Sequence, residues 1–360
     1  MARTFFLIFL GIALICPANL FAAEELRMLV YEGYAPEKHL EVFKQIVKAK
    51  YGVEININVK NISDIEDIYK GLKNKEFDLI TASNNLPNDP RYKYIQGKLT
   101  IPADLNNIPN FKDINPDLQK TPYFTDKGDV YGIPFCYGGY SLGYNTAYVK
   151  EAPPSWNVFW DPKYAGKYVL SSSFYDANIN ITALAMGIPK NKIYEYDAVA
   201  SPEFLEKLKL LVKNTGAFYE AIDDADTLQG KSLAACWGFS FSELAKRGEI
   251  WKAAFPKEGT PGYVDGWLMS HTLADNPKLK RIAEEWLNYV IGPDFQTEQV
   301  VRTLGVFPVS FAIRDRLTPE ETEAFHLNDP NFFKDNFVLW EILDKRTREG
   351  FKLFWKKAGR

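Results

Sequence analysis

Hydrophobic and polar positions change their period several times between residues 27 and 81. Residues 27–31 form a short apolar run, residues 54–60 alternate strictly, and residues 77–81 are again mainly apolar. Each run predicts a β-strand. Between them, apolar residues recur with the spacing of one helix face: Leu40, Phe43, Val47 and Tyr51, then Ile65, Ile68 and Leu72. Strands and helices that alternate in this way predict a parallel sheet with crossover helices.

A second alternation begins near residue 131, after a loop-rich stretch over 86–131 that contains many Pro and Asn residues. Its clearest helix starts at Ser201 and Pro202, has one apolar face, and ends at Gly216. Ser is a favoured N-cap, Pro is tolerated in the first turn, and Gly commonly ends a helix. The second half of the chain is therefore also expected to be α/β.

Three more elements complete the predicted order: a buried strand over 233–237, a helix over 275–292 and a helical tail over 336–357. The chain has 360 residues, which is more than one core comfortably holds, so two lobes are expected. Because neither an internal repeat nor a low-complexity linker is present, the chain should cross between the lobes more than once.

Composition narrows the function more than it narrows the fold. The net charge is −3 at pH 7, so the chain lacks the excess of positive charge that is typical of nucleic-acid-binding proteins. A mildly acidic surface suits a cationic ligand. The chain holds 8 Trp, 20 Tyr and 25 Phe. Many of these must be core residues, and an excess would suit a cleft whose rings stack on a ligand.

Residues 1–23 have the features of a secretion signal. Arg3 supplies a positive charge, and residues 5–15 form an apolar run too short for a comfortable membrane span. Small residues follow at Ala18, Ala22 and Ala23, any of which could precede the cleavage site. Cys16 follows Ile15 rather than a small residue, which disfavours a lipid anchor. We therefore expect a soluble chain that is exported to the periplasm.

Two cysteines, Cys136 and Cys236, remain after that cleavage. They could pair in an oxidising compartment, but two small buried side chains are the favoured interpretation. The three histidines are scattered and have no Cys or His partner at metal-ligand spacing: His39, His271 and His326. We expect neither a metal nor a cofactor.

Enzyme motifs are absent from the chain. There is no Gly-rich phosphate loop with a Lys, no Gly-x-Ser-x-Gly elbow and no His-Glu-x-x-His. Adjacent acidic residues at 223–224 and 284–285 stand in polar or helical contexts, so we interpret them as solvated. The chain is therefore not expected to be an enzyme, although a two-carboxylate hydrolase remains an alternative.

The segment 155–167 carries the pattern Trp-x-x-x-Trp-x-Pro-x-Tyr-x-Gly and follows a strand-like run over 132–145. This order resembles the periplasmic solute-binding proteins of ABC importers, closest to their spermidine/putrescine-binding branch. Five short segments resemble the same family in the same order: residues 31–36, 77–80, 235–238, 255–265 and 304–308.

The resemblance implies a type II periplasmic-binding-protein fold, in which two lobes enclose a ligand cleft. Each lobe would be a mixed, mainly parallel sheet flanked by helices. We expect lobe 1 to comprise residues 24–135 and 266–309, and lobe 2 residues 136–265 and 310–360. Such proteins close on their ligand and present it to a membrane permease. The resemblance thus predicts a monomer that binds a small cationic amine such as putrescine or spermidine.

In the family, the aspartate of an aromatic-x-Asp pattern holds an ammonium group, which here points to Asp265. A buried ammonium is costly unless it is paired, and a carboxylate supplies a charge-assisted hydrogen bond. Aromatic rings would contact the methylene chain and the charge, and a polar loop after the third strand would complete the site. The residues expected in these roles are Tyr31, Tyr34, Trp237, Tyr263, Ser83 and Asn84.

One segment departs from the family pattern. Relatives carry acidic residues after the first strand of the second lobe, where this chain has residues 171–178. Asp176 could take their role, or Tyr175 and Asn178 could replace them with neutral groups. Glu32 could hold a second amine instead. The ligand could accordingly be a diamine, a triamine or a smaller amine with one cationic end.

Three alternatives stay open at this point. The same fold could bind ferric iron through Tyr137 and Tyr140, thiamine, or an aminophosphonate held by residues 171–173. The chain could instead be a sensor subunit that signals to a receptor. The third alternative is the periplasmic hydrolase.

Overall fold

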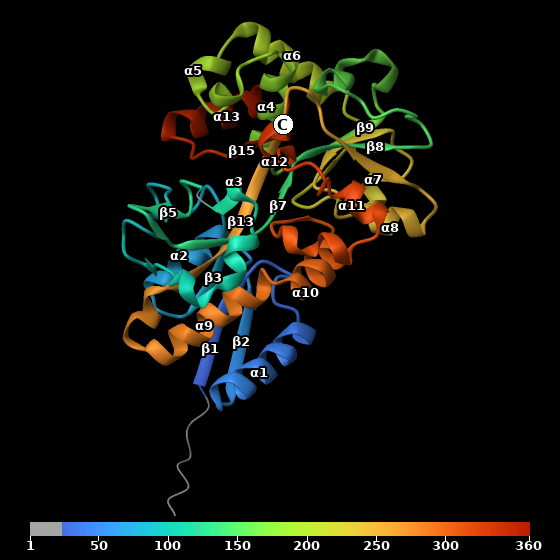
Figure 1. Ribbon diagram of the computed structural model, residues 1–360. Coiled ribbons are helices and arrows are strands. Elements are labelled where there is room, and N and C mark those ends of the chain that lie inside the picture. The colour runs from blue at the N-terminus through green and yellow to red at the C-terminus, as the bar shows by residue number, and fades with distance from the viewer. Residues whose placement is uncertain (1–23, 120) are drawn as a thin grey trace, which may run out of the picture.

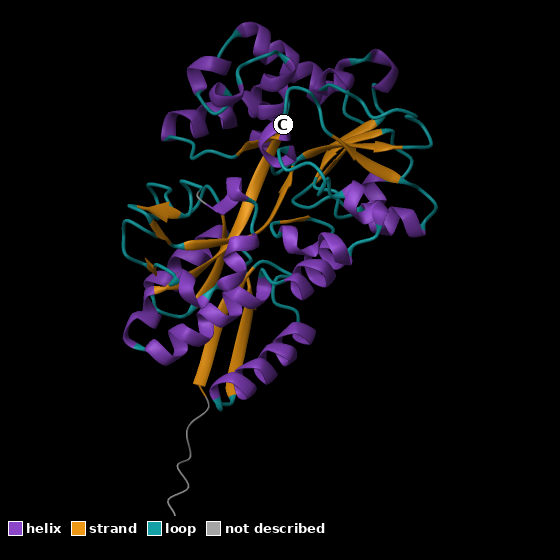
Figure 2. Ribbon diagram, viewed as in Figure 1, coloured by secondary structure: helices purple, strands orange, loops and turns teal. Residues whose placement is uncertain are grey.

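The computed structural model describes residues 24–119 and 121–360, and the predicted secretion signal lies outside them. Two bodies, each with its own sheet, are connected through the long strand β13 (Thr260–Ser270), which runs from the lower body toward the upper one in Figure 1. Helices cover the outer sides of both sheets (Figure 2). The predicted two-lobed α/β architecture is confirmed.

The first body contains an eight-stranded sheet with the order β14-β7-β13-β3-β1-β2, to which β4 and β15 add by pairing with β13. Strand β1 is parallel to β2 and β3, as the alternation of periods predicts, and β13 is antiparallel to β3 and β7. The other strands of this sheet are β1 (Glu24–Val30), β2 (Ile55–Asn61), β3 (Leu79–Ser83), β4 (Thr100–Ile101), β7 (Gly132–Gly139), β14 (Phe307–Pro308) and β15 (Phe337–Leu339). A small hairpin, β5 (Thr125–Asp126) and β6 (Asp129–Val130), stands beside it.

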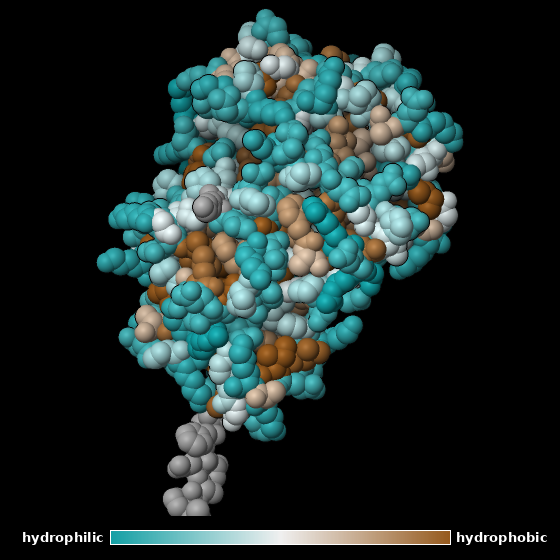
Figure 3. Space-filling view, viewed as in Figure 1, coloured by the Kyte–Doolittle hydropathy of each residue, from teal (hydrophilic) through white to brown (hydrophobic). Residues whose placement is uncertain are grey.

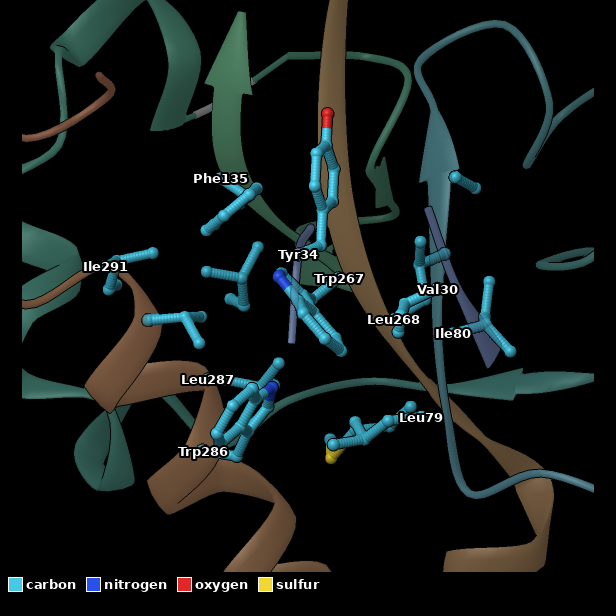
Figure 4. Close-up of a cluster of buried hydrophobic side chains, with 14 of the residues drawn as sticks. Val30, Tyr34, Leu79, Ile80, Phe135, Trp267, Leu268, Trp286, Leu287 and Ile291 are labelled. Carbon is cyan, nitrogen blue, oxygen red and sulfur yellow. The ribbon is translucent and has the colours of Figure 1, made fainter. Parts of the chain in front are cut away.

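Helices pack on this sheet through the apolar faces that the sequence predicts. Helix α1 buries Leu40, Phe43 and Val47 and ends at Gly52, whose φ of 67° is the left-handed conformation that favours Gly. Figure 4 shows the core, where Trp286 of α9 approaches Trp267 of β13. The helices of this body are α1 (Glu37–Tyr51), α2 (Ile65–Lys73), α3 (Pro116–Gln119), α9 (Pro277–Val290), α10 (Pro293–Phe295), α11 (Pro319–Ala324) and α12 (Phe332–Asn336).

The second body contains a five-stranded sheet with the order β10-β9-β11-β8-β12. Helix α6 begins with Ser201 as its N-cap, as predicted, because the Ser201 hydroxyl accepts a hydrogen bond from the Phe204 amide at 3.1 Å. The strands are β8 (Ser141–Asn145), β9 (Tyr168–Ser171), β10 (Ala217–Tyr219), β11 (Leu233–Cys236) and β12 (Trp251–Ala254). The helices are α4 (Tyr175–Ala185), α5 (Tyr196–Val199), α6 (Pro202–Lys213), α7 (Ala225–Leu228), α8 (Phe241–Lys246) and α13 (Lys345–Lys357).

The Trp-rich segment that carries the family resemblance is structural. It forms two 3₁₀ turns, Trp156–Trp160 and Pro162–Tyr164. Trp156 is fully buried, and its indole N–H donates to the Gly259 carbonyl at 2.8 Å. The preceding Ser155 hydroxyl donates to Glu258 at 2.5 Å. The segment therefore ties the core of the second body to the turn that leads into β13.

The chain passes between the two sheets three times: from β7 to β8, from β12 to β13, and from β15 to α13. The first two passages meet where Gly139 pairs with Gly262. A Cβ on Gly262 would lie 2.7 Å from the Phe337 ring, which belongs to the third passage. Glycine is needed here because the three passages pack directly against one another.

The tail over 336–357 differs from the single helix that its aromatic and aliphatic pattern predicts. Residues Phe337–Leu339 form strand β15, which pairs in parallel with the start of β13, and helix α13 begins only at Lys345. An available strand edge on β13 supplies ladder hydrogen bonds to this stretch. Tertiary pairing thus overrides the local helical pattern.

Figure 3 shows one face of the molecule as mostly hydrophilic, with separate apolar patches. Within the described residues, none of the helices has the length and apolar character needed to cross a bilayer.

Candidate ligand-binding site

The register of the first sheet places two predicted site residues, Asp265 and Ser83, in one row with Cys136. Asp265 of β13 stands opposite Cys136 of β7 on one side and opposite Ser83 of β3 on the other. Side chains that are opposite one another on neighbouring strands lie on the same face of a sheet. Strand β1 ends nearby, because the Tyr31 amide donates to the Thr81 hydroxyl of β3 at 3.0 Å. The carboxyl ends of β1 and β3 therefore meet at Asp265, where open α/β sheets bind ligands.

Two hydroxyl groups hold the Asp265 carboxylate. Ser83 Oγ donates to Oδ1 and Tyr34 OH donates to Oδ2, each at 2.5 Å. The Tyr34 hydroxyl also lies 3.2 Å from Cys136 Sγ, and the Tyr31 and Tyr34 rings meet edge to face at 5.6 Å. Figure 4 shows Tyr34 beside β13 with its oxygen pointing away from the apolar core. These four predicted residues, Tyr31, Tyr34, Ser83 and Asp265, lie together.

Asp265 is only 4 % exposed, and burial raises its pKa to about 6. The two hydroxyl donors act in the opposite direction, because hydrogen bonds to a carboxylate favour its charged form. Within residues 24–119 and 121–360, no Lys or Arg forms an ion pair with it. Three phenols and a thiol face it instead: the half-buried Tyr31 and the buried Tyr34, Tyr263 and Cys136. The carboxylate can ionise near neutral pH and has hydrogen-bonding capacity for a cation.

An aromatic wall adjoins this acidic row. The Trp237 ring lies 5.0 Å from Phe174 and 5.3 Å from Trp340, and it is nearly perpendicular to both. The Phe174 and Trp340 rings are almost parallel to each other, at 9° and 6.5 Å. Tyr263, two residues from Asp265 on β13, approaches both Trp237 and Trp340 at 5.9 Å. Tyr263 therefore connects the acidic row to the wall, and each sheet contributes to the combined site.

The backbone of Trp237 is held in place by Asp223. One Asp223 oxygen accepts from the amides of Trp237 and Gly238 at 2.8 and 3.1 Å, and the other accepts from Ser240, through its amide at 3.0 Å and its hydroxyl at 2.6 Å. Asp223 is 4 % exposed, so the interpretation of this acid as solvated is wrong. Its neighbour Asp224 is exposed and caps α7.

The second acidic pair, Glu284 and Glu285, is also buried, contrary to prediction. Glu284 accepts hydrogen bonds from the Asp104 amide and the Asn107 side chain at 3.0 and 2.6 Å. Glu285 pairs with Lys50 at 2.6 Å. Both acids are therefore used to hold the first body together.

Four other predicted residues belong to neither the Asp265 row nor the aromatic wall: Asn84, Glu32, Tyr175 and Asp176. The Asn84 side chain is fully buried and forms hydrogen bonds with two backbone groups. Its amide nitrogen donates to the Trp340 carbonyl at 2.8 Å, and its amide oxygen accepts from the Val264 amide at 3.0 Å. It thereby anchors the start of the Trp340 segment. Glu32 is exposed at the tip of the turn between the two tyrosines.

Tyr175 and Asp176 form the first turn of α4. Asp176 is half-buried, and burial raises its pKa even though its carboxylate accepts from the Ala177 amide at 2.9 Å. Tyr175 is also half-buried, and burial raises the pKa of its phenol. Asn178 is fully buried and joins Tyr140 to the Ser171 carbonyl, so its amide supports the fold of the second body.

The groups considered for other ligands do not assemble into a site. Tyr137 packs among Phe307, Phe333 and Phe337, whereas the Tyr140 hydroxyl donates to Asn178 in the core of the second body. Within the described residues, no cluster of His, Cys, Asp and Glu is arranged to hold a metal. The hydroxyls of Ser171 and Ser172 donate to the Glu220 and Tyr219 carbonyls.

Phe174, Trp340 and Asp223 are site residues that the sequence analysis missed. Phe174 lies within the segment 171–178, which was expected to face the ligand through polar groups, and its aromatic side chain could have indicated a place in the aromatic wall. Trp340 was hidden because the tail was expected to be one helix. Nothing in the sequence separates Asp223 from Asp224, since only the fold decides which of the two is buried.

Surface hollows also lie elsewhere. Two of about 640 and 580 Å³ share Tyr148, Lys163 and Tyr164 and include residues that precede β9 and β11. Trp237 follows the other end of β11, so these hollows are at the opposite edge of the second sheet.

The two cysteines of the described residues, Cys136 and Cys236, are buried and unpaired, which confirms the favoured interpretation.

Comparison with known proteins places the chain among solute-binding proteins. The family model of the bacterial extracellular solute-binding proteins matches residues 41–329. The putrescine-binding periplasmic protein SpuD of Pseudomonas aeruginosa is 23% identical over 325 residues, which cover 83% of this chain and 84% of SpuD. The putrescine-binding periplasmic protein PotF of Escherichia coli is 26% identical over 270 residues, covering 67% and 69%.

Among solved structures, the spermidine/putrescine ABC transporter substrate-binding protein PotD from Streptococcus pneumoniae has the same fold. The TM-score is 0.72 at 18% identity, over 93% of this chain and 100% of PotD. The expected class of fold, the type II two-lobed architecture, is thereby confirmed.

Proposed function

We propose that this chain, which belongs to the family of bacterial extracellular solute-binding proteins, captures a small cationic amine for an ABC importer. Family and fold are those of transport solute-binding proteins rather than enzymes. The proposed ligand is a polyamine such as putrescine or spermidine, which relatives of this chain are named for.

The observation that carries the proposal is Asp265 and its surroundings. A buried carboxylate without a Lys or Arg partner in the described residues stands beside a wall of aromatic rings. An ammonium group would form a charge-assisted hydrogen bond with the carboxylate. The rings would cover the methylene chain and attract the charge through their faces. This combination of groups suits an alkylamine better than a sugar or an anion.

Ligand contact would come from both lobes, which supports closure about the three inter-lobe passages. We propose the two-lobe division with all three boundaries between the lobes moved relative to the sequence expectation, the first of them to the end of β7 at Gly139. Residues 260–265 belong to the first sheet through β13, and Phe332, Phe333 and Phe337 pack in the first hydrophobic cluster. Lobe 1 would then comprise 24–139 and 260–339, and lobe 2 would comprise 140–259 and 340–360.

A second amine has two candidate partners. Asp176 at the start of α4 is half-buried in lobe 2, and Glu32 is exposed at the turn in lobe 1. We propose Asp176 for this role, because its pKa is raised by burial and an approaching ammonium would offset that unfavourable burial. The proposed setting is a periplasmic monomer that delivers its ligand to a membrane permease, after removal of residues 1–23.

A thermal-shift screen tests the proposed function. Putrescine or spermidine should raise the unfolding midpoint, while sugars and phosphonates should not. A ligand that binds only the native state adds about 2.7 kcal/mol at a hundredfold excess over Kd. Thiamine and ferric iron belong in the same panel, since both were alternatives for this fold. A shift with a sugar or a phosphonate and none with any amine would refute the cationic ligand.

Trp237→Leu and Trp340→Leu should each weaken amine binding by about 1–2 kcal/mol, the size of a desolvated cation–π contact. Both variants should fold, because Asp223 holds the Trp237 backbone and Asn84 holds the Trp340 backbone. Calorimetry gives the affinities. The matched control is Trp160→Leu, whose indole bonds the Lys207 carbonyl away from the site. Equal losses of affinity in all three variants would show that the aromatic wall does not contact the ligand.

A further inference from the structure

The helix η7 (Gln296–Leu304) is π-helical and approaches the turn that carries Tyr34 from outside the ligand site. Its buried Gln299 donates from Nε2 to the Gly33 carbonyl at 2.8 Å. Its buried Gln296 donates to the Phe135 carbonyl at 3.0 Å, and the Phe135 ring packs 4.7 Å from the Tyr34 ring. Runs of π-helix are rare and are frequently found at functional sites.

The turn held by Gln299 has little freedom of its own. The Tyr34 amide donates to the Tyr31 carbonyl at 3.1 Å, which closes a tight turn between the two tyrosines. Gly33 has a φ of 81°, as the third position of a type II turn requires. A Cβ on Gly33 would lie 2.9 Å from Leu304 Cδ2, so η7 packs directly against this residue. The direction of the Tyr34 side chain thus depends on how the turn sits on η7.

We propose that Gln299 is a positioning residue for the ligand site, which holds the Gly33 carbonyl and thereby aims the Tyr34 hydroxyl at Asp265. The contacts form one continuous path: Gln299 Nε2 to Gly33 O, through the peptide to Tyr34, and Tyr34 OH to Asp265 Oδ2. The role in ligand affinity rests on the proposed function, whereas the effect on the Asp265 carboxyl does not.

The path has a measurable consequence at Asp265. Burial disfavours the charged carboxylate, and the hydroxyls of Ser83 and Tyr34 oppose that effect by donating to it. The remaining groups that face it are the half-buried Tyr31 phenol, the buried Tyr263 phenol and the buried Cys136 thiol, and none of them carries a compensating positive charge. If the Tyr34 hydroxyl no longer points at Asp265, the carboxylate loses one hydrogen bond that stabilises its charge, and burial raises the pKa of Asp265 further. A proton then competes more strongly with an ammonium ligand.

The test compares Gln299→Met, which keeps the length of the side chain but not its donor, with wild type. The readout is the titration midpoint of Asp265 in the ligand-free protein, followed by carbon NMR and assigned with Asp265→Asn. We expect the midpoint to rise by about 0.5–1 pH unit, the effect of losing one aimed donor. Amine affinity should in consequence fall by less than about twofold at pH 7 and by about three- to tenfold at pH 5, where the carboxyl is mostly protonated. In a Tyr34→Phe background, Gln299→Met should shift neither quantity further.

A matched control lies on the same helix. Thr297 is buried, and its hydroxyl has no hydrogen-bond partner among the described residues, so Thr297→Val should leave the midpoint unchanged. An unchanged midpoint in Gln299→Met, or an equal shift in the Tyr34→Phe background, overturns the proposal. If the Met variant does not fold, Gln299→Asn replaces it: its amide is one methylene shorter, so the titration midpoint of Asp265 should rise in the same way. A wild-type protein that binds no amine refutes the proposed function, and the ligand-free midpoint still decides the role of Gln299.

Discussion

Replacing Asp265 by Asn should remove most of the affinity for an amine while the ligand-free protein stays at least as stable as wild type at pH 7. The ammonium loses its charged partner in a desolvated site, which is expected to weaken binding by about 2–5 kcal/mol. Stability is retained because burial disfavours the ionised Asp265, and an amide carries no charge to bury. The Asn oxygen and nitrogen can also serve as partners for the Ser83 and Tyr34 hydroxyls.

The pH dependence of the same residue has a definite sign. The pKa of Asp265 is raised to about 6 in the folded protein, so folding favours the protonated carboxyl. The free energy of unfolding should therefore decrease as the pH rises from about 4 to about 6, by at most about 1.4 kcal/mol per pH unit. Amine binding requires the ionised form, so affinity should be full above about pH 7 and fall below pH 6 by up to about tenfold per unit.

Calorimetry between pH 5 and 8, together with thermal unfolding, measures both dependences. In Asp265→Asn, the contribution of this carboxyl to each should disappear. Asp197→Asn is the matched control, because Asp197 is an exposed acid that pairs with Arg346 away from the site. An Asp265→Asn protein with wild-type affinity and a normal unfolding curve would show that Asp265 does not contact the ligand.

Replacing Asp223 by Ala should destabilise the second lobe strongly, although its neighbour Asp224 tolerates the same change. Asp223 accepts four hydrogen bonds while almost fully buried, so its loss leaves the donors of Trp237, Gly238 and Ser240 without their acceptor. Each bond to a charged acceptor contributes about 1.5–3 kcal/mol, and because such losses are not additive we expect about 3–5 kcal/mol in total.

Asp224→Ala is the matched control for this prediction. It removes only the cap of the short helix α7, where Asp224 accepts from the Thr227 amide at 2.8 Å, a loss of about 1 kcal/mol. Chemical denaturation measures both variants. Similar unfolding free energies for the two would contradict the anchoring role of Asp223. A selective loss in Asp223→Ala should also weaken amine binding, since Trp237 would no longer be held.

One segment that carries the resemblance to the family, residues 155–167, lies outside the candidate site. Trp156 is buried in the core of the second body and bonds the Gly259 carbonyl. It supplies a large apolar side chain and a hydrogen-bond donor at this junction. The resemblance predicted the fold through such structural segments, and it pointed to the candidate site through others, among them the one that contains Tyr263 and Asp265.

The candidate site was partly predictable because strand ends can be read from the sequence. Tyr31, Ser83 and Trp237 each follow a run of strand period, and the carboxyl ends of parallel strands gather at one edge of a sheet. Phe174 and Trp340 were not found. Trp340 follows a strand that forms only because β13 offers an edge to pair with, so no local pattern indicates it.

The sequence by itself determined the class of fold, the order of its elements and the strand ends at which a site could form. These depend on the periodicity of apolar residues and on local capping and turn chemistry. Only the tertiary structure decided which side chains meet and which acids are buried. Strand register places Asp265 between Ser83 and Cys136, and a loop 14 residues before Trp237 brings Asp223 to its amide. Such contacts join residues far apart in the chain, and their energies depend on burial, which has no local signature in the sequence.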